Sequence, residues 1–194
     1  SGTIITEIGR LTKLALLELN ENDLTGSIPT ELGLLTELTS AGLWNNQLTG
    51  PLPKEISALG NLAFLIASDN QLDGPLPRDI DRMSSLSVLS LGSNAFNGAL
   101  PTRIGHLQEL TQLFLQDNGF TGPIPTELGK ISTLNLLFMG SNDLTGTIPS
   151  ELGMLTQLTW LDLTSNSLTG TVPIEVQDLM NTTVVDYVGN AIVD

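Results

Sequence analysis

The stretch LTWLDLTSNSLTGTVP, residues 158–173, decides the fold of this chain, because its elements recur from one end of the sequence to the other. Leu161 and Leu163 alternate with Trp160 and Asp162, which is the period of a short strand with one buried face. An Asn, a Leu-Thr-Gly triplet and a Pro follow the strand. Gly permits backbone geometry that other residues resist and Pro ends regular pairing, so the chain should turn back here.

The asparagine of this stretch belongs to a series with a constant spacing of 24 residues. The series consists of Asn22, Asn46, Asn70, Asn94, Asn118, Asn142, Asn166 and Asn190. Glycines from Gly2 to Gly170 and prolines from Pro29 to Pro173 keep the same step. A constant period of this length indicates a solenoid of stacked coils. Because an Asn amide carries donors and an acceptor, the asparagines should form a ladder that pairs backbone groups inside the bends.

The repeats predict an α/β solenoid. We expect a single domain over residues 1–194, with a truncated repeat at 1–10, full repeats at 11–178 and a degenerate terminal repeat at 179–194. No single coil can bury its own leucines, so the coils must stack. Their strands should form a concave parallel sheet of about eight strands, opposite short helical, 3-10 or irregular convex turns. Because the sequence begins within a repeat, we interpret it as a piece of a longer protein.

Two local features carry further expectations. Residues 126–129 place a Thr and a Glu ahead of an apolar stretch, as at the start of a helical turn, and Gly33, Gly129 and Gly153 should close such turns. In the terminal repeat, Thr182 stands where the first Leu is expected. The remaining departures there are Val185 and Tyr187 at inward positions, and Val184 and Val188 at outward ones.

Composition excludes several classes of protein. The formal charge is −14, from 21 acidic and 7 basic residues, which argues against binding to nucleic acid or to an anionic membrane surface. A partner guided by charge should be neutral or basic. The chain has no Cys and a single histidine, His106, so it offers neither a zinc site nor a catalytic triad. No apolar run is long enough to span a membrane.

The full repeat, LxxLxLxxNxLTGxIPxxLGxL, resembles the plant-type leucine-rich-repeat family over residues 2–192. This family includes the ectodomains of receptor-like kinases and receptor-like proteins and the polygalacturonase-inhibiting proteins. The resemblance implies a right-handed superhelix with a second short sheet along LTGxIP, and recognition of peptides, proteins or glycans. It also implies an extracellular or cell-surface location, although the residues alone leave a cytoplasmic location open. The sequon at Asn181 fits glycosylation in a secreted setting.

Ligand contacts should come from outward strand positions, because the inward positions are committed to the core. Apolar side chains gather at the outward positions of three adjacent strands and should form one exposed patch: Phe114, Leu136, Phe138 and Trp160. A second, smaller patch is expected from Trp44, Phe64 and Ile66. The alternative is that these side chains only stabilise the sheet by packing across strands, or are covered by a neighbouring segment.

Acidic residues are expected on the same face, at Glu18, Glu21, Asp69, Asp117, Asp162 and Asp186, whereas its outward strand positions contain no Lys or Arg. A basic ligand would suit this face. Asp162 and Asp186 are equivalent positions one coil apart, so their carboxylates should lie about 5 Å apart if they do not splay. Such a pair could bind a cation or act as a glycosidase dyad, but it would lie on an open sheet with no pocket.

The main hypothesis is therefore a non-enzymatic recognition module, without cofactor or metal, that binds a protein, a peptide or a glycan. A co-receptor or assembly partner would fit such a module, and a purely architectural scaffold is the main alternative. Hydrolysis by Asp162 and Asp186 is a further alternative, as is ice binding by a threonine column. The column consists of Thr25, Thr49, Thr121, Thr145 and Thr169, and is interrupted by Asp73 and Asn97.

Overall fold

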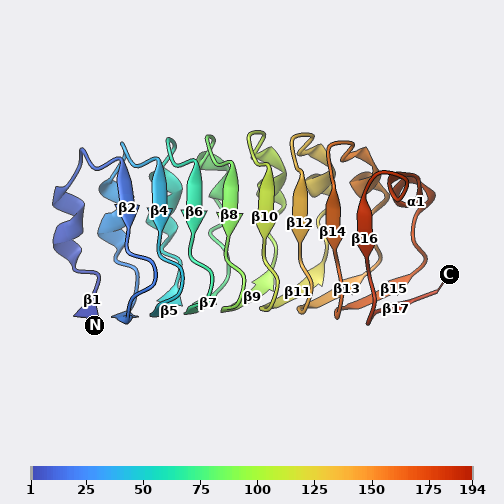
Figure 1. Ribbon diagram of the computed structural model, residues 1–194, viewed down its shortest axis with the longest axis horizontal. Helices are drawn as coiled ribbons and strands as arrows, with labels where there is room; N and C mark the ends of the chain where they lie inside the picture. The colour runs from blue at the N-terminus through green and yellow to red at the C-terminus, as the bar shows by residue number, and fades with distance from the viewer. Residues whose placement is uncertain (1, 194) are drawn as a thin grey trace.

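The computed structural model describes residues 2–193 as a row of stacked coils, each with the same path (Figure 1). Within this range, one strand from each coil joins a parallel eight-stranded sheet. Its strands, in order along the stack, are β2 (Leu16–Glu18), β4 (Ser40–Gly42), β6 (Phe64–Ile66), β8 (Val88–Ser90), β10 (Gln112–Phe114), β12 (Leu136–Phe138), β14 (Trp160–Asp162) and β16 (Val184–Asp186).

A second parallel sheet runs along the LTGxIP segments, with nine strands among the described residues. It consists of β1 (Gly2–Thr3), β3 (Leu24–Gly26), β5 (Gln47–Pro51), β7 (Gln71–Gly74), β9 (Ala95–Ala99), β11 (Gly119–Pro123), β13 (Asp143–Gly146), β15 (Ser167–Gly170) and β17 (Ala191–Ile192). Each coil therefore contributes one strand to the eight-stranded sheet and one to the second sheet.

Short helices lie behind the eight-stranded sheet (Figure 1). Seven of those in the described part of the chain are 3-10 helices: η1 (Thr6–Arg10), η2 (Thr30–Leu34), η3 (Lys54–Ala58), η4 (Ile80–Arg82), η5 (Thr102–His106), η6 (Thr126–Lys130) and η7 (Ser150–Met154). The last coil carries an α-helix, α1 (Ile174–Leu179). No helix between residues 2 and 193 is long and apolar enough to cross a membrane.

The core fills the space between the sheets and the helices. It consists of the repeated leucines and their Ile, Ala, Met and Phe equivalents, most of them completely buried. Phe96 and Phe120 replace leucines in adjacent coils and stack with their ring centroids 6.1 Å apart. The predicted inward positions are thus the core positions, as the period required.

The repeated asparagines join neighbouring coils by hydrogen bonds. Asn142 is typical, because its Nδ2 donates to the carbonyl oxygens of Leu115, Met139 and Gly140 at 3.0, 3.2 and 3.1 Å. Its Oδ1 accepts a hydrogen bond from the N–H of Phe120 at 3.0 Å. The other ladder asparagines, beginning with Asn46 and ending with Asn190, make equivalent bonds to the preceding coil. Asn22 in the first coil is exposed, and its side chain bonds to the carbonyls of Leu19 and Asn20.

The glycines of the helical turns have a different role from the one we predicted. Gly33, Gly129 and Gly153 do not close the turns by adopting a left-handed conformation, since each lies inside its helix without a positive φ. A Cβ atom at Gly129 would instead overlap the backbone of Glu151 in the next coil. These glycines are required because adjacent helical turns approach each other closely.

The last coil differs from the prediction at one position. Thr182 is exposed, and Thr183 occupies the core instead, with its Oγ1 donating to the carbonyl of Leu158 at 2.6 Å. The shift follows the replacement of a 3-10 helix by α1, which rises less per residue. Val185 and Tyr187 are half-buried and Val184 and Val188 exposed, as predicted.

Candidate ligand-binding surface

The outward side chains of the eight-stranded sheet form one continuous surface, which we call the eight-strand face. Each strand contributes three residues. The central one is buried in every strand from β2 to β14 and half-buried in β16, while its two neighbours point outward, as in the Gln112–Leu113–Phe114 strand. The sheet is in register from end to end, so outward residues 24 positions apart lie side by side. Residues predicted to point outward at the same place in successive repeats are therefore neighbours on adjacent strands.

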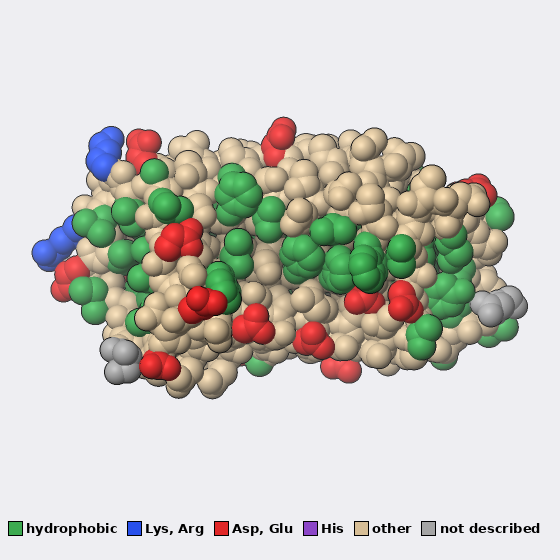
Figure 2. Space-filling view, in the orientation of Figure 1, with side chains coloured by type: hydrophobic (Ala, Val, Ile, Leu, Met, Phe, Trp, Pro, Cys, Tyr) green, Lys and Arg blue, Asp and Glu red, His purple; other side chains and the backbone are tan. Residues whose placement is uncertain are grey.

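Four apolar side chains on β10, β12 and β14 form what we call the aromatic cluster: Phe114, Leu136, Phe138 and Trp160. The ring centroids of Phe114 and Phe138 are 5.3 Å apart, and those of Phe138 and Trp160 are 5.4 Å apart, both pairs tilted. Trp160 is 45% exposed and the others are half-buried. Figure 2 shows hydrophobic side chains gathered over these strands. The sequence-predicted patch is thus brought together by the sheet.

The second predicted patch lies closer to the N-terminal end of the stack. Phe64 and Ile66 are the outward residues of β6, and Trp44 follows β4 in the preceding coil. Phe64 is 43% exposed, while Trp44 and Ile66 are half-buried. Ser90 of β8 separates Ile66 from Phe114, and Gln112 of β10 separates Val88, the neighbour of Phe64, from Leu136. The two patches are therefore distinct apolar areas on one face.

The acids of this face fall into two structural groups. Glu21, Asp69 and Asp117 precede the ladder asparagines and have left-handed backbone angles, with φ values of 55°, 56° and 56°. Asn45 and three serines adopt this conformation at the same place in other coils. Because Asn and Asp tolerate the left-handed region better than most side chains, the bend itself accounts in part for Asp69 and Asp117. The backbone conformation is therefore a second reason for acidic residues at these positions, besides the predicted ligand binding.

Asp162 and Asp186 do lie on paired positions, but each carboxylate is engaged by its own bend. Oδ1 of Asp162 accepts hydrogen bonds from the N–H of Thr164 at 2.9 Å and from its Oγ1 at 2.7 Å. Oδ1 of Asp186 accepts one from the N–H of Val188 at 3.1 Å. Within residues 2–193, no group of three or more His, Cys, Asp and Glu side chains could hold a metal ion. One oxygen of each carboxylate therefore caps the turn that follows its own strand.

Two polar groups on this face were missed by the sequence reasoning. Asn20 Oδ1 and Gln116 Oε1 are buried acceptors without a hydrogen-bond partner among the described residues. Gln116 lies over Gly92, where a Cβ atom would come within 2.5 Å of Gln116 Nε2. A buried acceptor without a donor costs free energy, so these two amides lower the stability of the chain.

The remaining sequence-predicted residues lie away from the eight-strand face. Asn181 is exposed just after α1, and its Nδ2 donates to the carbonyl of Asp178 at 3.1 Å. His106, at the end of η5, is also exposed. The threonine column projects from the second sheet, and all of its members are exposed: Thr25, Thr49, Thr121, Thr145 and Thr169. Asp73 and Asn97 interrupt this column on β7 and β9.

The Leucine Rich Repeat family model matches residues 109–131 and 157–179. A TDR receptor superposes with a TM-score of 0.94 at 33% sequence identity, over 97% of this chain and 33% of that chain. The Arabidopsis receptor kinase HAESA, in complex with an N-terminally extended IDA peptide hormone, gives 0.89 at 32% identity, over 97% and 32% of the two chains. This chain belongs to the plant-type leucine-rich-repeat family.

This leucine-rich-repeat chain spans about a third of the length of those two receptors. HAESA has also been solved with IDA and the co-receptor SERK1. A plant ice-binding protein is similar too, with a TM-score of 0.80 at 29% identity over 90% of this chain and 56% of that one. No curated protein sequence matches the chain at a significant level. The comparisons confirm the predicted leucine-rich-repeat solenoid, a fold that serves several purposes among these relatives.

Proposed function

We propose that the eight-strand face binds a peptide or an extended protein segment, with the aromatic cluster as its apolar anchor. The observation that carries this proposal is the exposure of Trp160. Its ring contacts that of Phe138, which in turn contacts that of Phe114. Contiguous apolar groups at a protein surface usually mark an interaction site, and Trp in particular is enriched among residues that dominate binding energy. Packing across strands explains the ring contacts, but it does not account for leaving 45% of Trp160 in water.

The charge of this face supports a basic ligand. Its outward strand positions carry Glu18, Asp162 and Asp186 and contain no Lys or Arg. In Figure 2, Lys and Arg are visible only near one end of the molecule, whereas acidic side chains lie along the face. A ligand with Lys or Arg beside an apolar residue would be steered to the acids and held at the aromatic cluster.

The relatives support the same proposal. HAESA binds a peptide hormone with a fold like this one, and has been solved together with a co-receptor. We propose by analogy that this segment is part of an extracellular recognition module, that it is not an enzyme, and that it also contacts a second protein. The single-domain organisation over residues 1–194 and glycosylation at Asn181 are parts of this proposal.

Binding to a panel of basic peptides tests the proposal, with neutral and acidic peptides and cell-wall oligosaccharides measured in parallel by calorimetry. For a peptide that binds, Phe138→Ala and Trp160→Ala should each weaken the affinity about 30-fold, as expected for anchor residues. Phe64→Ala, an exposed aromatic in the smaller patch, is the matched control and should change the affinity less than about threefold. Unchanged affinities in the Phe138 and Trp160 variants would rule out this anchor, and tight binding of an oligosaccharide alone would replace the peptide with a glycan.

A scaffold role is the second candidate, and the terminal coil favours it. Val184, which pairs with Trp160, is 56% exposed, and Val188 just after β16 is 74% exposed. A partner subunit could cover these side chains together with the aromatic cluster. Light scattering of the purified chain distinguishes the two roles, because a monomer at all accessible concentrations contradicts self-assembly through this face.

A further inference from the structure

A groove lies on the helical side of the solenoid, away from the eight-strand face. It has a volume of about 630 Å³ and extends from η2 across η3 to the beginning of η4. Its apolar lining includes Leu34, Ala58 and Pro77. Ligand sites in proteins commonly have volumes between about 300 and 1,000 Å³, so this groove is large enough for a small organic molecule.

The groove lies where two adjacent coils have a side chain at a position that is glycine in most of the helical turns. The position of Gly33, Gly105, Gly129 and Gly153 is filled by Ser57 in η3 and by Asp81 in η4. In the other coils a Cβ atom here would meet the backbone of the following coil, as at Gly33 against Glu55. With a real side chain at Ser57, the following coil must stand off, and residues 78–79 form a turn rather than the first part of a helix.

Basic residues gather at this groove in an otherwise acidic protein. Three of the seven Lys and Arg side chains line it, namely Lys54, Arg78 and Arg82. Between residues 2 and 193, none of the three makes a salt bridge within 4.0 Å. Two acids, Glu55 and Asp79, also contribute to the lining.

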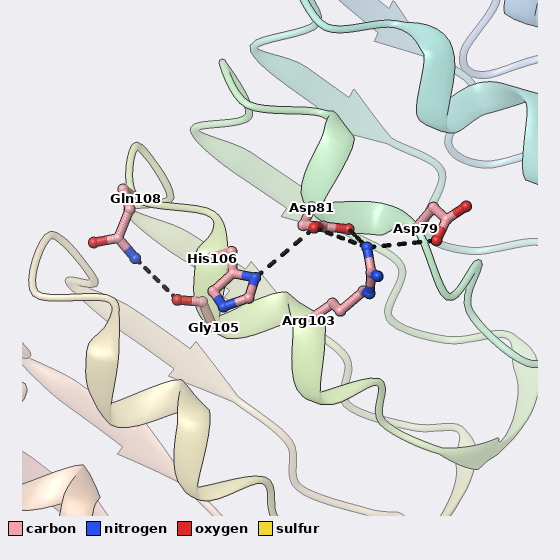
Figure 3. A network of polar contacts seen from close by, with 6 residues as sticks. All are labelled: Asp79, Asp81, Arg103, Gly105, His106 and Gln108. Atoms are coloured by element: carbon pink, nitrogen blue, oxygen red, sulfur yellow. Dashed lines mark hydrogen bonds and ion pairs between the residues drawn. The ribbon is translucent and has the colours of Figure 1, made fainter.

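A neighbouring network explains why these cations stay free. Arg103 of the next coil forms salt bridges with Asp79 and Asp81 (Figure 3). Its Nη1 lies 3.6 Å from Asp79 Oδ1 and 3.2 Å from Asp81 Oδ2. His106 adds a contact to Asp81 at 3.8 Å. The acids closest to Arg78 and Arg82 in sequence are therefore already engaged, which leaves the groove cations available to an external anion.

Ser57 supplies an independent sign of an unfilled site. It lines the groove, it is 3% exposed, and its Oγ has no hydrogen-bond partner within residues 2–193. A buried hydroxyl without a partner is destabilising, whereas a serine hydroxyl can donate to an oxyanion.

We propose that this groove binds an amphiphilic organic anion, a molecule with an apolar body of about one or two rings and one sulfonate, sulfate, phosphate or carboxylate group. The apolar body lies against Leu34, Ala58 and Pro77. The oxyanion is held by Lys54, Arg78 and Arg82. This site is independent of the peptide surface on the other side of the coils.

Fluorescence titration with 8-anilinonaphthalene-1-sulfonate tests the proposal, because this probe combines an aromatic body with a sulfonate. We expect saturable binding at a single site. An Arg78→Gln, Arg82→Gln double variant should bind at least tenfold more weakly, since each charged hydrogen bond contributes to affinity. The matched control is Arg10→Gln with Lys130→Gln, which removes the same charge from the position of Arg82 in η1 and η6 and should leave the affinity unchanged.

The shape of the groove is tested separately from its charge. Ala58→Phe fills the groove while keeping every cation, and should abolish probe binding. Met154→Phe places the same side chain at the equivalent position of η7, which is already exposed, and should have no effect. Far-ultraviolet circular dichroism establishes that each variant is folded before its affinity is compared.

Three results would overturn the proposal. Equal affinities for the Arg78→Gln, Arg82→Gln variant and its control would show that the groove cations do not hold the anion. Loss of binding in Phe138→Ala would place the probe on the aromatic cluster instead. Displacement of the probe by inorganic sulfate at an equal concentration would show an anion site that does not use the apolar lining.

Discussion

Replacing Asn142 with Ala tests how the asparagine ladder stabilises the solenoid. The carbonyl of Leu115 also accepts from Asn118, and that of Met139 also accepts from Asn166, so both keep a second asparagine donor in the variant. The N–H of Phe120 loses the Asn142 oxygen. An orphaned buried N–H costs about 1–3 kcal/mol, and three weakened carbonyl bonds add about 0.5 kcal/mol each. We therefore expect the free energy of unfolding to fall by about 2.5–4.5 kcal/mol.

Urea unfolding followed by circular dichroism measures this loss. Asn22→Ala is the matched control, because Asn22 has the same place in its repeat but is exposed and bonds only to the carbonyls of Leu19 and Asn20. Its substitution should cost less than about 1 kcal/mol. Equal losses for the two variants would refute the reasoning, since the cost would then come from the bend itself rather than from the links between coils.

Two more variants test the packing of the coils. Gly129→Ala should lower the free energy of unfolding by about 1–3 kcal/mol, because its Cβ would overlap the backbone of Glu151. The control is Gly60→Ala, whose Cβ would have its nearest neighbour 3.7 Å away, and it should cost less than about 1 kcal/mol in the same urea titration. Phe120→Ala should lower the free energy of unfolding by about 3–5 kcal/mol, because a buried ring is lost. Phe64→Ala, which removes an exposed ring, should lower it by less than about 1 kcal/mol. Similar melting temperatures for the two variants would contradict the assignment of the core.

Most of the fold could be predicted because a repeat converts sequence spacing into spatial adjacency. Once the coils are 24 residues long and stacked in register, Leu136 must lie beside Trp160 and Phe114 beside Phe138, and the structure pairs both. The contact between the Phe138 and Trp160 rings follows from the same adjacency. The buried face followed from the alternation of apolar and polar residues in each strand.

The parts that could not be predicted depend on distances between coils, which a period does not contain. The spacing shows that Ser57 and Asp81 stand where other repeats have glycine. Only the structure shows that the backbone of the next coil lies close to this position, as Glu151 does at Gly129, so that a side chain there opens a groove. Likewise, the spacing predicted that Asp162 lies beside Asp186. The hydrogen bond that the Asp162 carboxylate accepts from the N–H of Thr164 depends on the local bend, which the spacing does not contain.

The paired acceptors of the asparagine ladder have a consequence for the evolution and engineering of this protein. The carbonyl of Leu115 accepts from Asn118 in its own coil and from Asn142 in the next. If the 24 residues 119–142 were deleted, Asn166 would occupy the place of Asn142 and the same carbonyl would regain its second donor. Both sheets would close in register across the junction. A ladder with interchangeable rungs sets no length for the molecule, so whole coils can be removed or duplicated while a deletion of any other size would break the pairing.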